Sequence, residues 1–381
     1  MLLILALLFW ASMGALLHSY VVYPLVLPML ARLFGKPVRR DPTYVPSVAF
    51  IVPVYNEESV IKAKLENILR LDYPAESLSV WIGSDCSNDK THEIVRLFPD
   101  PRVHLWIAPE RGGKTGVLNN LTPMVKADIL VFTDANTMHR PDSLRKLVAP
   151  FADPVVGGVA AHIDHAVRDS EQREERFYRS FESRQKEYES RLHSTISAFG
   201  GYYAVRATLF RPIPPNAYSN DDVLIPMNVV RRRRRVWFEP SATAFEDTTE
   251  ALGAEVKRRV RIGAGNFQSL VWLADFLNPL RGWPWFCFVS HKALRWTSPL
   301  LVLVALLSCA ALCALSAAPL YCLLLGLGLA FIVAGLSSRI VPTKTTGYML
   351  YFLAMNAALL LGFLRFARGI RSAAWERTER Q

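Results

Sequence analysis

The sequence predicts an α/β protein with a mostly parallel sheet, flanked by helices long enough to cross a membrane. Between roughly residues 45 and 135, short apolar segments alternate with segments of helical spacing, a pattern typical of parallel sheets covered by helices. Polar residues follow directly after several of these apolar segments. Long apolar runs stand at residues 2–34 and from about residue 299 onward, and such runs suit membrane spans.

The composition fits a catalytic domain attached to a membrane. The 381 residues are 51% hydrophobic and carry a formal net charge of +11. We expect an N-terminal transmembrane helix at 1–35, a domain at 45–280, an interfacial helix at 283–297, about three transmembrane segments within 298–368, and a basic tail at 369–381.

The first apolar run predicts a retained transmembrane helix, because it is longer than a signal-peptide core and no basic residue precedes it. The basic residues after it, Arg32, Lys36, Arg39 and Arg40, place the following domain in the cytoplasm by the positive-inside rule. Three later spans would carry the C-terminus outside, whereas the arginines of the tail favour the inside. Either one late segment is re-entrant or interfacial, or the tail breaks the rule; we favour a cytoplasmic tail.

The segment 283–297 mixes three tryptophans with basic residues. This mixture predicts a helix lying in the membrane interface rather than a buried core helix.

The five cysteines show no metal-ligand spacing, which argues against a zinc site. We expect no disulfide in a reducing cytoplasm, and a packing role for Cys309 and Cys313 on one face of a membrane helix.

The first half of the domain is the more regular. Unbroken apolar runs rich in β-branched residues predict the strands, and i, i+3, i+4 spacing predicts the helices. The expected strands are 48–54, 78–83, 103–107 and 129–133, and the expected helices are 60–71, 91–97 and 115–125.

In the second half, charge and glycine placement guide the assignment. A long charged helix is expected at 172–193 and a strand entered by a glycine turn at 199–205. A helix begins near the capping residues 219–222 and is closed by the arginines 231–235, followed by a strand at 236–239 and a basic helix at 255–261.

Asp134 and Asn136 come directly after the predicted strand 129–133. Ligands bind beyond the carboxyl ends of strands in open α/β sheets. Carboxylate and amide oxygens suit a hard cation that holds a phosphate. The pair alone is weak evidence for a metal site, because capping and turn roles explain most pairs of this spacing.

Other motifs join this pair in a fixed order, and together they resemble one family. The motifs are Val52-Pro-Val-Tyr-Asn-Glu57, Ser84-Asp-Cys-Ser-Asn-Asp89, Gly113-Lys114 with Leu118-Asn119, Thr133-Asp-Ala-Asn136, Asn220-Asp-Asp222 and Arg258-Arg-Val-Arg261. The chain resembles the family-two glycosyltransferases of GT-A (Rossmann-like) fold, in the membrane branch that includes cellulose, chitin and hyaluronan synthases.

The resemblance implies a nucleotide-sugar site at the strand ends. Asp134 and Asn136 occupy the places of the family's Asp-x-Asp metal motif, so Mg²⁺ or Mn²⁺ is the expected cofactor. Asn136 departs from the pattern and removes one negative charge, so metal binding is weaker or another ligand contributes. The donor-binding residues implied are Pro53, Val54, Tyr55, Glu57, Asp85, Lys114, Asp134, Arg258 and Arg261.

The acidic pair Asp221-Asp222 is the implied place of the general base, and we favour Asp222 over Asp221. Adjacent carboxylates raise one pKa, which suits a base. Ile262 stands where the family has a tryptophan after its arginine motif, and this puts processive synthesis in doubt. Glu182 lies in a helix resembling the branch's acceptor-side helix, although a solvated face explains it equally well. The run 231–235 reads as a solvated or membrane-surface patch.

We therefore expect an inverting glycosyltransferase in the bacterial inner membrane, multi-pass, with its catalytic domain in the cytoplasm. The donor is most simply a UDP-sugar, and the acceptor is a saccharide or a lipid-linked group. The partners include membrane lipids and no nucleic acid. Processive polymer synthesis and single-sugar transfer both remain open. Two alternatives of another class are an inactive membrane scaffold and a nucleic-acid-binding membrane protein using 231–235, which lacks an aromatic platform for bases.

Overall fold

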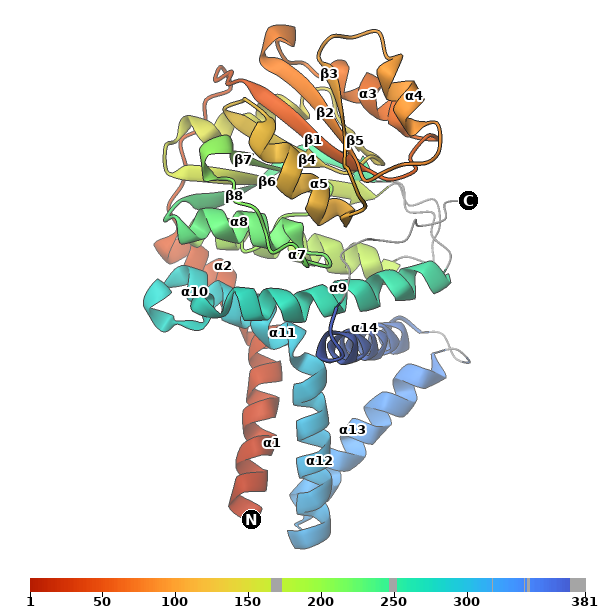
Figure 1. Ribbon diagram of the computed structural model, residues 1–381. Helices are drawn as coiled ribbons and strands as arrows, with labels where there is room; N and C mark the ends of the chain where they lie inside the picture. The colour runs from red at the N-terminus through yellow and green to blue at the C-terminus, as the bar shows by residue number, and fades with distance from the viewer. Residues whose placement is uncertain (166–172, 247–251, 317, 339, 341–342, 371–381) are drawn as a thin grey trace.

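The computed structural model describes residues 1–165, 173–246, 252–316, 318–338, 340 and 343–370. It has an α/β domain above a group of long helices (Figure 1). Most of the basic tail predicted at 369–381 lies outside the described residues.

The domain is built on an eight-stranded sheet in the order β3-β2-β1-β4-β7-β6-β8-β5. From the ladder pairings, six strands run in one direction, while β7 and β5 run the opposite way. The predicted mostly parallel α/β sheet is therefore confirmed in its first half, and the whole sheet is mixed. The strands are β1 Val48–Val54, β2 Leu78–Ser84, β3 Val103–Ile107, β4 Ile129–Thr133, β5 Thr137–His139, β6 Val156–His165, β7 Tyr202–Arg206 and β8 Arg235–Glu246.

Alternate side chains of each strand point to opposite faces, so the sheet has a core on both sides. In β1, Phe50 and Val52 face one core with α3 (Ile61–Leu69), α4 (Thr91–Arg96) and α6 (Ser143–Val148). Ala49 and Ile51 face the other core with α5 (Gly113–Leu121) and α8 (Asp221–Arg231). This second core continues into the helices next to the membrane.

The expected strands of the first half are confirmed to within one residue at each end. The sequence reading missed β5, β6 and α6, and ended β8 seven residues early. Glycines at the start of β6 and polar residues inside it and β8 hide the alternation on which a strand prediction depends.

The N-terminal helix is longer than a membrane span needs. It runs without a break through α1 (Leu2–Leu17), a π-helical turn η1 (His18–Val22) and α2 (Tyr23–Phe34). Its 33 residues span about 50 Å at 1.5 Å per residue, against a hydrocarbon core of about 30 Å. The second part is buried against α7 (Arg173–Leu192), where Tyr23 and Leu27 are fully covered. This helix therefore joins the group of long helices to the α/β domain.

Three more helices are long and apolar enough to cross a membrane: α12 (Ser298–Ser316), α13 (Pro319–Ser337) and α14 (Lys344–Ala367). α12 packs along α1, whereas α14 runs across them beneath α9 (Leu252–Trp272) (Figure 1). At the crossing, a Cβ added to Gly362 would lie 2.6 Å from the Gly263 carbonyl carbon, so the two backbones touch.

The segment predicted as an interfacial helix is helical from residue 283 to residue 296. It consists of α10 (Trp283–Cys287), a π-helix η9 (Phe288–Ala293) and α11 (Leu294–Trp296). His291, Arg295 and Trp296 are buried in it. Its basic side chains contact α7, as described below, and its place in the membrane interface stays a prediction.

A disulfide joins Cys313 of α12 to Cys322 of α13. The expectation of no disulfide, and of a packing role for Cys313, was therefore wrong. That expectation assumed a cytoplasmic setting, whereas this turn lies at the end of the two helices away from the catalytic domain (Figure 1).

Candidate active site

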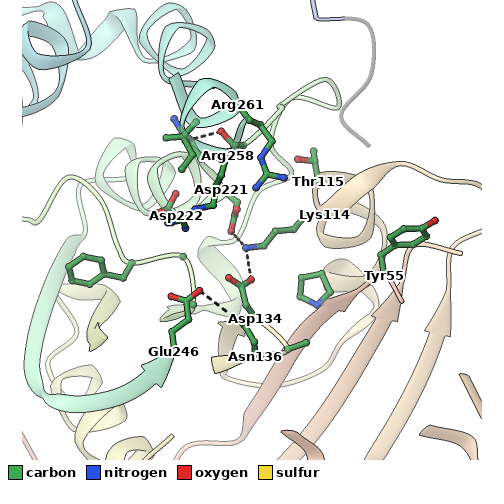
Figure 2. A pocket seen from close by; sticks show the side chains of 18 of the residues that line it. Tyr55, Lys114, Thr115, Asp134, Asn136, Asp221, Asp222, Glu246, Arg258 and Arg261 are labelled. Carbon is green, nitrogen blue, oxygen red and sulfur yellow. Dashed lines mark hydrogen bonds and ion pairs between the residues drawn. The ribbon is translucent and has the colours of Figure 1, made fainter. Parts of the chain in front are cut away.

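A pocket of about 490 Å³ opens between the carboxyl ends of β1 and β4 on one side and α9 on the other. The structure brings ten of the predicted site residues to its lining: Pro53, Tyr55, Glu57, Lys114, Asp134, Asn136, Asp221, Asp222, Arg258 and Arg261 (Figure 2). Val54 and Asp85, the other two, are buried behind it.

The predicted metal motif lies in the turn between β4 and β5. Lys114 of α5 donates to Asp134 Oδ1 at 2.9 Å and also lies 3.2 Å from Asp221 Oδ2. The Asn136 side chain points toward Glu246 at the end of β8, with Nδ2 3.5 Å from Oε1. One lysine thus joins the metal motif to the acidic pair (Figure 2).

The protein supplies too few ligands to surround a metal ion, so the residues present fit a site that substrate and water complete. Among the described residues no group of three His, Cys, Asp or Glu side chains could hold an ion. Asp134 and Asn136 offer two oxygen ligands at the edge of the pocket, which leaves positions for phosphate oxygens and water around a cation such as Mg²⁺ or Mn²⁺. The charge on Lys114 opposes a cation there unless a diphosphate is also present.

A buried lysine braces this turn from below. Lys64 of α3 donates to Thr133 Oγ1 at 2.8 Å and to the Thr137 carbonyl, so it ties both ends of the turn. Burial lowers the pKa of Lys64 to about 7, although Asp134 opposes the shift. Its position inside a helix gave no sequence signal.

The acidic pair opens α8 after Asn220, which adopts a left-handed conformation at φ 71°. Asp221 is engaged: its carboxylate accepts from Tyr203 Oη at 3.0 Å in addition to its ion pair with Lys114. Among the described residues, the Asp222 side chain makes no hydrogen bond or ion pair. It lies in the pocket near Gly200, where an added Cβ would be 3.7 Å from Oδ2.

Burial, followed by the neighbouring Asp221 carboxylate, raises the pKa of Asp222 to about 6 against the attraction of Lys114, Lys186 and Lys292. Lys114 shifts the other way. Burial lowers its pKa, but Asp134 and Asp221 outweigh that effect and hold it above the ordinary lysine value. Near neutral pH the pocket therefore contains a permanent cation beside a carboxylate that can exchange a proton.

Helix α9 closes the pocket on the membrane side. Arg258, Arg261 and Ile262 line the pocket from this helix. It is held close to the acidic pair, because Asn220 Nδ2 donates to Asn266 Oδ1 at 2.8 Å. A Cβ on Gly265 would lie 2.1 Å from Ser219 Oγ, so this approach requires a glycine.

Behind the other end of the pocket, Asp85 holds a turn. Its Oδ1 accepts from the backbone N–H groups of Gly112 and Gly113 at 2.8 and 3.0 Å. The guanidinium of Arg111 stacks over the Tyr55 ring at 3.7 Å. Asp85 thus orders the loop before α5, and its predicted contact with the donor stays a prediction.

A buried ionic cluster lies between α7 and η9, on the membrane side of Asp222. We call Glu182, Lys186, Glu189, His291 and Lys292 the interhelix cluster. His291 bridges the two glutamates, with Nε2 2.9 Å from Glu182 and Nδ1 2.5 Å from Glu189. Lys292 donates to Glu182 at 2.8 Å, and Tyr23 of α2 donates to Glu189 at 2.7 Å.

The solvated-face reading of Glu182 is wrong, because Glu182 is only 6% exposed. Burial raises its pKa, but His291, Lys292 and Lys186 outweigh this and hold it well below the ordinary value. Burial and Lys292 lower the pKa of Lys186 to about 8. The sequence reading missed the lysines, because charges at helical spacing normally mark an exposed face.

The arginine run 231–235 makes more contacts within the protein than a solvated or membrane-surface patch would. Arg231 pairs with Asp275 at 2.5 Å, and Arg235 donates to the carbonyls of Ser190 and His193 at 2.7 Å. Arg232, Arg233 and Arg234 in the middle are exposed. The exposed patch is therefore three residues wide.

Comparisons with known proteins point to glycosyltransferases. A model described as Glycosyl transferase family 2 matches residues 49–211. The chain is 35% identical over 118 residues to the beta-monoglucosyldiacylglycerol synthase of Synechocystis sp., covering 30% of this chain and 25% of that protein. It is 25% identical over 238 residues to glycosyltransferase AglE of Haloferax volcanii, covering 61% and 76% of the two chains. The chain thus spans about a quarter of the length of the synthase it matches.

A solved structure matches nearly the whole chain. The mannosyltransferase PcManGT from Pyrobaculum calidifontis, in complex with GDP-Man and Mn²⁺, aligns with a TM-score of 0.72 and 25% identity. The alignment covers 96% of this chain and 98% of that one, so it includes the membrane helices as well as the GT-A domain. Residues 49–211 thus match glycosyl transferase family 2, and nearly the whole chain is similar in structure to a mannosyltransferase.

Proposed function

We propose that the protein is a membrane-bound, inverting glycosyltransferase that moves a hexosyl group from a nucleoside-diphospho-sugar to an acceptor hydroxyl. One observation carries this proposal. The Asp222 carboxylate shares a single pocket with Asp134 and Asn136 at the strand ends and with Arg258 and Arg261 on α9. A base, a cation-binding edge and phosphate-binding arginines are the parts that such a transfer needs.

In the proposed reaction Asp222 accepts the proton of the acceptor hydroxyl. The acceptor oxygen then forms a bond to the anomeric carbon while the bond from that carbon to the diphosphate oxygen breaks. Attack from the face opposite the leaving group inverts the configuration. The nucleoside diphosphate leaves with the electron pair.

The negative charge that develops on the diphosphate is met by residues of this chain. Lys114 supplies a point charge, and the guanidiniums of Arg258 and Arg261 can pair with phosphate oxygens in a forked geometry. Asp134 and Asn136 would hold a divalent cation, which when bound neutralises phosphate charge.

The donor is most simply a UDP-sugar, and a GDP-sugar is the main competitor, since PcManGT is described with GDP-Man. A panel of UDP- and GDP-sugars, scored by release of nucleoside diphosphate with and without Mn²⁺, tests the proposal. No release from any of these donors would contradict it.

For the acceptor we infer a saccharide or lipid-linked hydroxyl in bacterial polysaccharide or glycolipid assembly. Ile262 in place of an aromatic residue at the pocket, and the likeness to a glycolipid synthase, support transfer of a single sugar over processive synthesis. Product length on a gel, from purified protein and the active donor, separates these two. A ladder of products would establish processivity.

We infer that α1, α12 and α13 cross the membrane and that α14 lies along its cytoplasmic surface. This is supported by the course of α14 across α12 beneath α9 (Figure 1), with Gly362 packed on Gly263. Three spans with the domain inside return the chain to the cytoplasm after α13. The tail then obeys the positive-inside rule.

A further inference from the structure

We propose that Glu246 is a positioning residue that turns the Asn136 amide so that its oxygen faces the cation. This inference rests on the proposed function, because it concerns how the same site holds its metal. It also accounts for the presence of an amide where the resembling family has a second carboxylate.

The need for such a residue follows from the chemistry of the amide. Either oxygen of an aspartate can face a cation, whereas an asparagine presents one oxygen and one NH₂ group. Mg²⁺ and Mn²⁺ take oxygen ligands, and an NH₂ turned toward the ion would repel it. An acceptor that holds the NH₂ on the other side makes the asparagine a usable ligand.

Glu246 stands where this acceptor is required. In the antiparallel β5–β8 ladder, Glu246 lies opposite Thr137, the residue after Asn136. Its Oε1 is 3.5 Å from Asn136 Nδ2, and both side chains line the pocket (Figure 2). That distance is at the outer limit of a hydrogen bond, and the charge of a carboxylate acceptor strengthens such a contact.

Charge supports the same assignment. The Asp134 carboxylate is paired with Lys114 at 2.9 Å, and Asn136 adds no charge of its own. Glu246 is the carboxylate that lies against Asn136 on the side away from Lys114 (Figure 2), so it brings a second negative charge to this edge of the pocket. The ladder fixes the backbone of Glu246 beside Thr137.

The test measures Mn²⁺ affinity by electron paramagnetic resonance in the presence of UDP and, separately, of GDP. Glu246→Ala should weaken Mn²⁺ binding about tenfold or more, as is usual when a residue that orients a metal ligand is removed. Glu246→Gln keeps an acceptor oxygen but no charge, so its loss should be smaller. Glu76→Ala, at an exposed turn away from the pocket, is the matched control and should change nothing.

The decisive arm uses Asn136→Asp, which needs no orientation. In that background Glu246→Ala should weaken Mn²⁺ binding less than it does in the unmodified protein, because only the charge of Glu246 is lost and no ligand needs to be oriented. An equal loss in both backgrounds, or Glu246→Ala and Glu246→Gln variants that bind Mn²⁺ like the unmodified protein, would overturn this inference alone. Absence of Mn²⁺ binding by the unmodified protein with either nucleotide would overturn the inference together with the metal part of the proposed function.

Discussion

The two sides of the pocket are built by different means. On the donor side, single polar residues follow buried strands, and the parallel ladders bring their side chains to one edge. On the membrane side, α9 lies over the acidic pair, and the interhelix cluster lies beneath α7 with its charges buried in pairs. The general base that we propose, Asp222, stands between the two.

The difference concerns what sets the charge on each side. At the strand ends the side chains are partly open to the pocket, and substrate can complete their coordination. In the interhelix cluster the interacting side chains come from the N-terminal helix, α7 and η9. Their positions are therefore fixed by the packing of the N-terminal helix and η9 against α7. We infer that the donor side determines what binds, and that the membrane side adjusts the pKa of the base through Lys186 and Lys292.

Asp222→Asn tests the centre of this comparison and should have the largest effect. An asparagine cannot accept the acceptor proton, so turnover should fall by about a thousandfold or more. Thermal stability should not fall, because the raised pKa shows that the buried charged form is disfavoured. Steady-state transfer and a thermal unfolding curve measure the two.

Asp221→Asn is the matched control, because it breaks the contacts with Lys114 and Tyr203. We expect weaker donor binding and lower stability there, with part of the turnover kept. The opposite pattern, an active Asp222→Asn protein and an inactive Asp221→Asn protein, would move the base to Asp221. An Asp222→Asn protein with unchanged function would support the inactive-scaffold alternative.

Glu182→Ala tests the membrane side alone. It removes the partner of Lys292 and His291 and leaves the charge of Lys292 without its carboxylate; breaking a buried ion pair in this way typically costs about 3–5 kcal/mol. Thermal unfolding in a fixed detergent measures the loss. Glu187→Ala, on the same helix but in an exposed pair with Arg191, should cost less than about 1 kcal/mol. Equal losses of stability in the two variants would mean that Glu182 in the interhelix cluster contributes no more to stability than an exposed ion pair does.

Asp222 itself predicts how transfer depends on pH. A base works only when deprotonated, so with a pKa of about 6 the rate should rise as pH increases through 6 and then level off. Below that value the rate should fall about tenfold per pH unit. The pKa of Lys114 is raised, so it stays charged throughout this range. A profile of kcat/KM against pH measures the midpoint for the free enzyme.

Lys186→Met then connects the two sides. Lys186 lowers the pKa of Asp222, so its loss should move the midpoint of the rate profile above 6. Arg184→Met, at an exposed position of the same helix, should leave the midpoint in place. A midpoint that is unmoved by Lys186→Met would separate the interhelix cluster from the base and break the proposed coupling.

The same contrast explains what the sequence could predict. The strands β1, β3 and β4 and the residues that follow β1 and β4 were predictable, because a buried parallel strand and the polar turn after it are both local patterns. Glu246 is likewise a polar residue at the end of a strand, β8. Pro240 and Ser241 interrupt the pattern of buried residues in that strand, so its end was not recognised.

The membrane side could not be read in this way. Glu182, Lys186 and Glu189 have the spacing of a solvated helix face, and only the docking of η9 makes that face interior. Likewise, tryptophans and basic residues at 283–297 have the composition of an interfacial helix. The burial of these side chains depends on packing with partners about a hundred residues away, which a local sequence pattern does not contain.

Removing the disulfide between Cys313 and Cys322 should have the smallest effect on turnover, because the disulfide lies far from both sides of the pocket. With the domain in the cytoplasm, the α12–α13 turn faces the oxidising side of the membrane. In right-side-out vesicles an impermeant reductant should therefore expose two more thiols to an impermeant maleimide. The Cys313→Ser/Cys322→Ser variant should show no such gain and should keep turnover within about twofold, because no contact of this turn reaches the pocket in the described residues. Thiols exposed only in inverted vesicles would mean that the topology is the reverse of the one inferred. A loss of turnover as large as that of a pocket variant would mean that the far ends of α12 and α13 also influence the pocket.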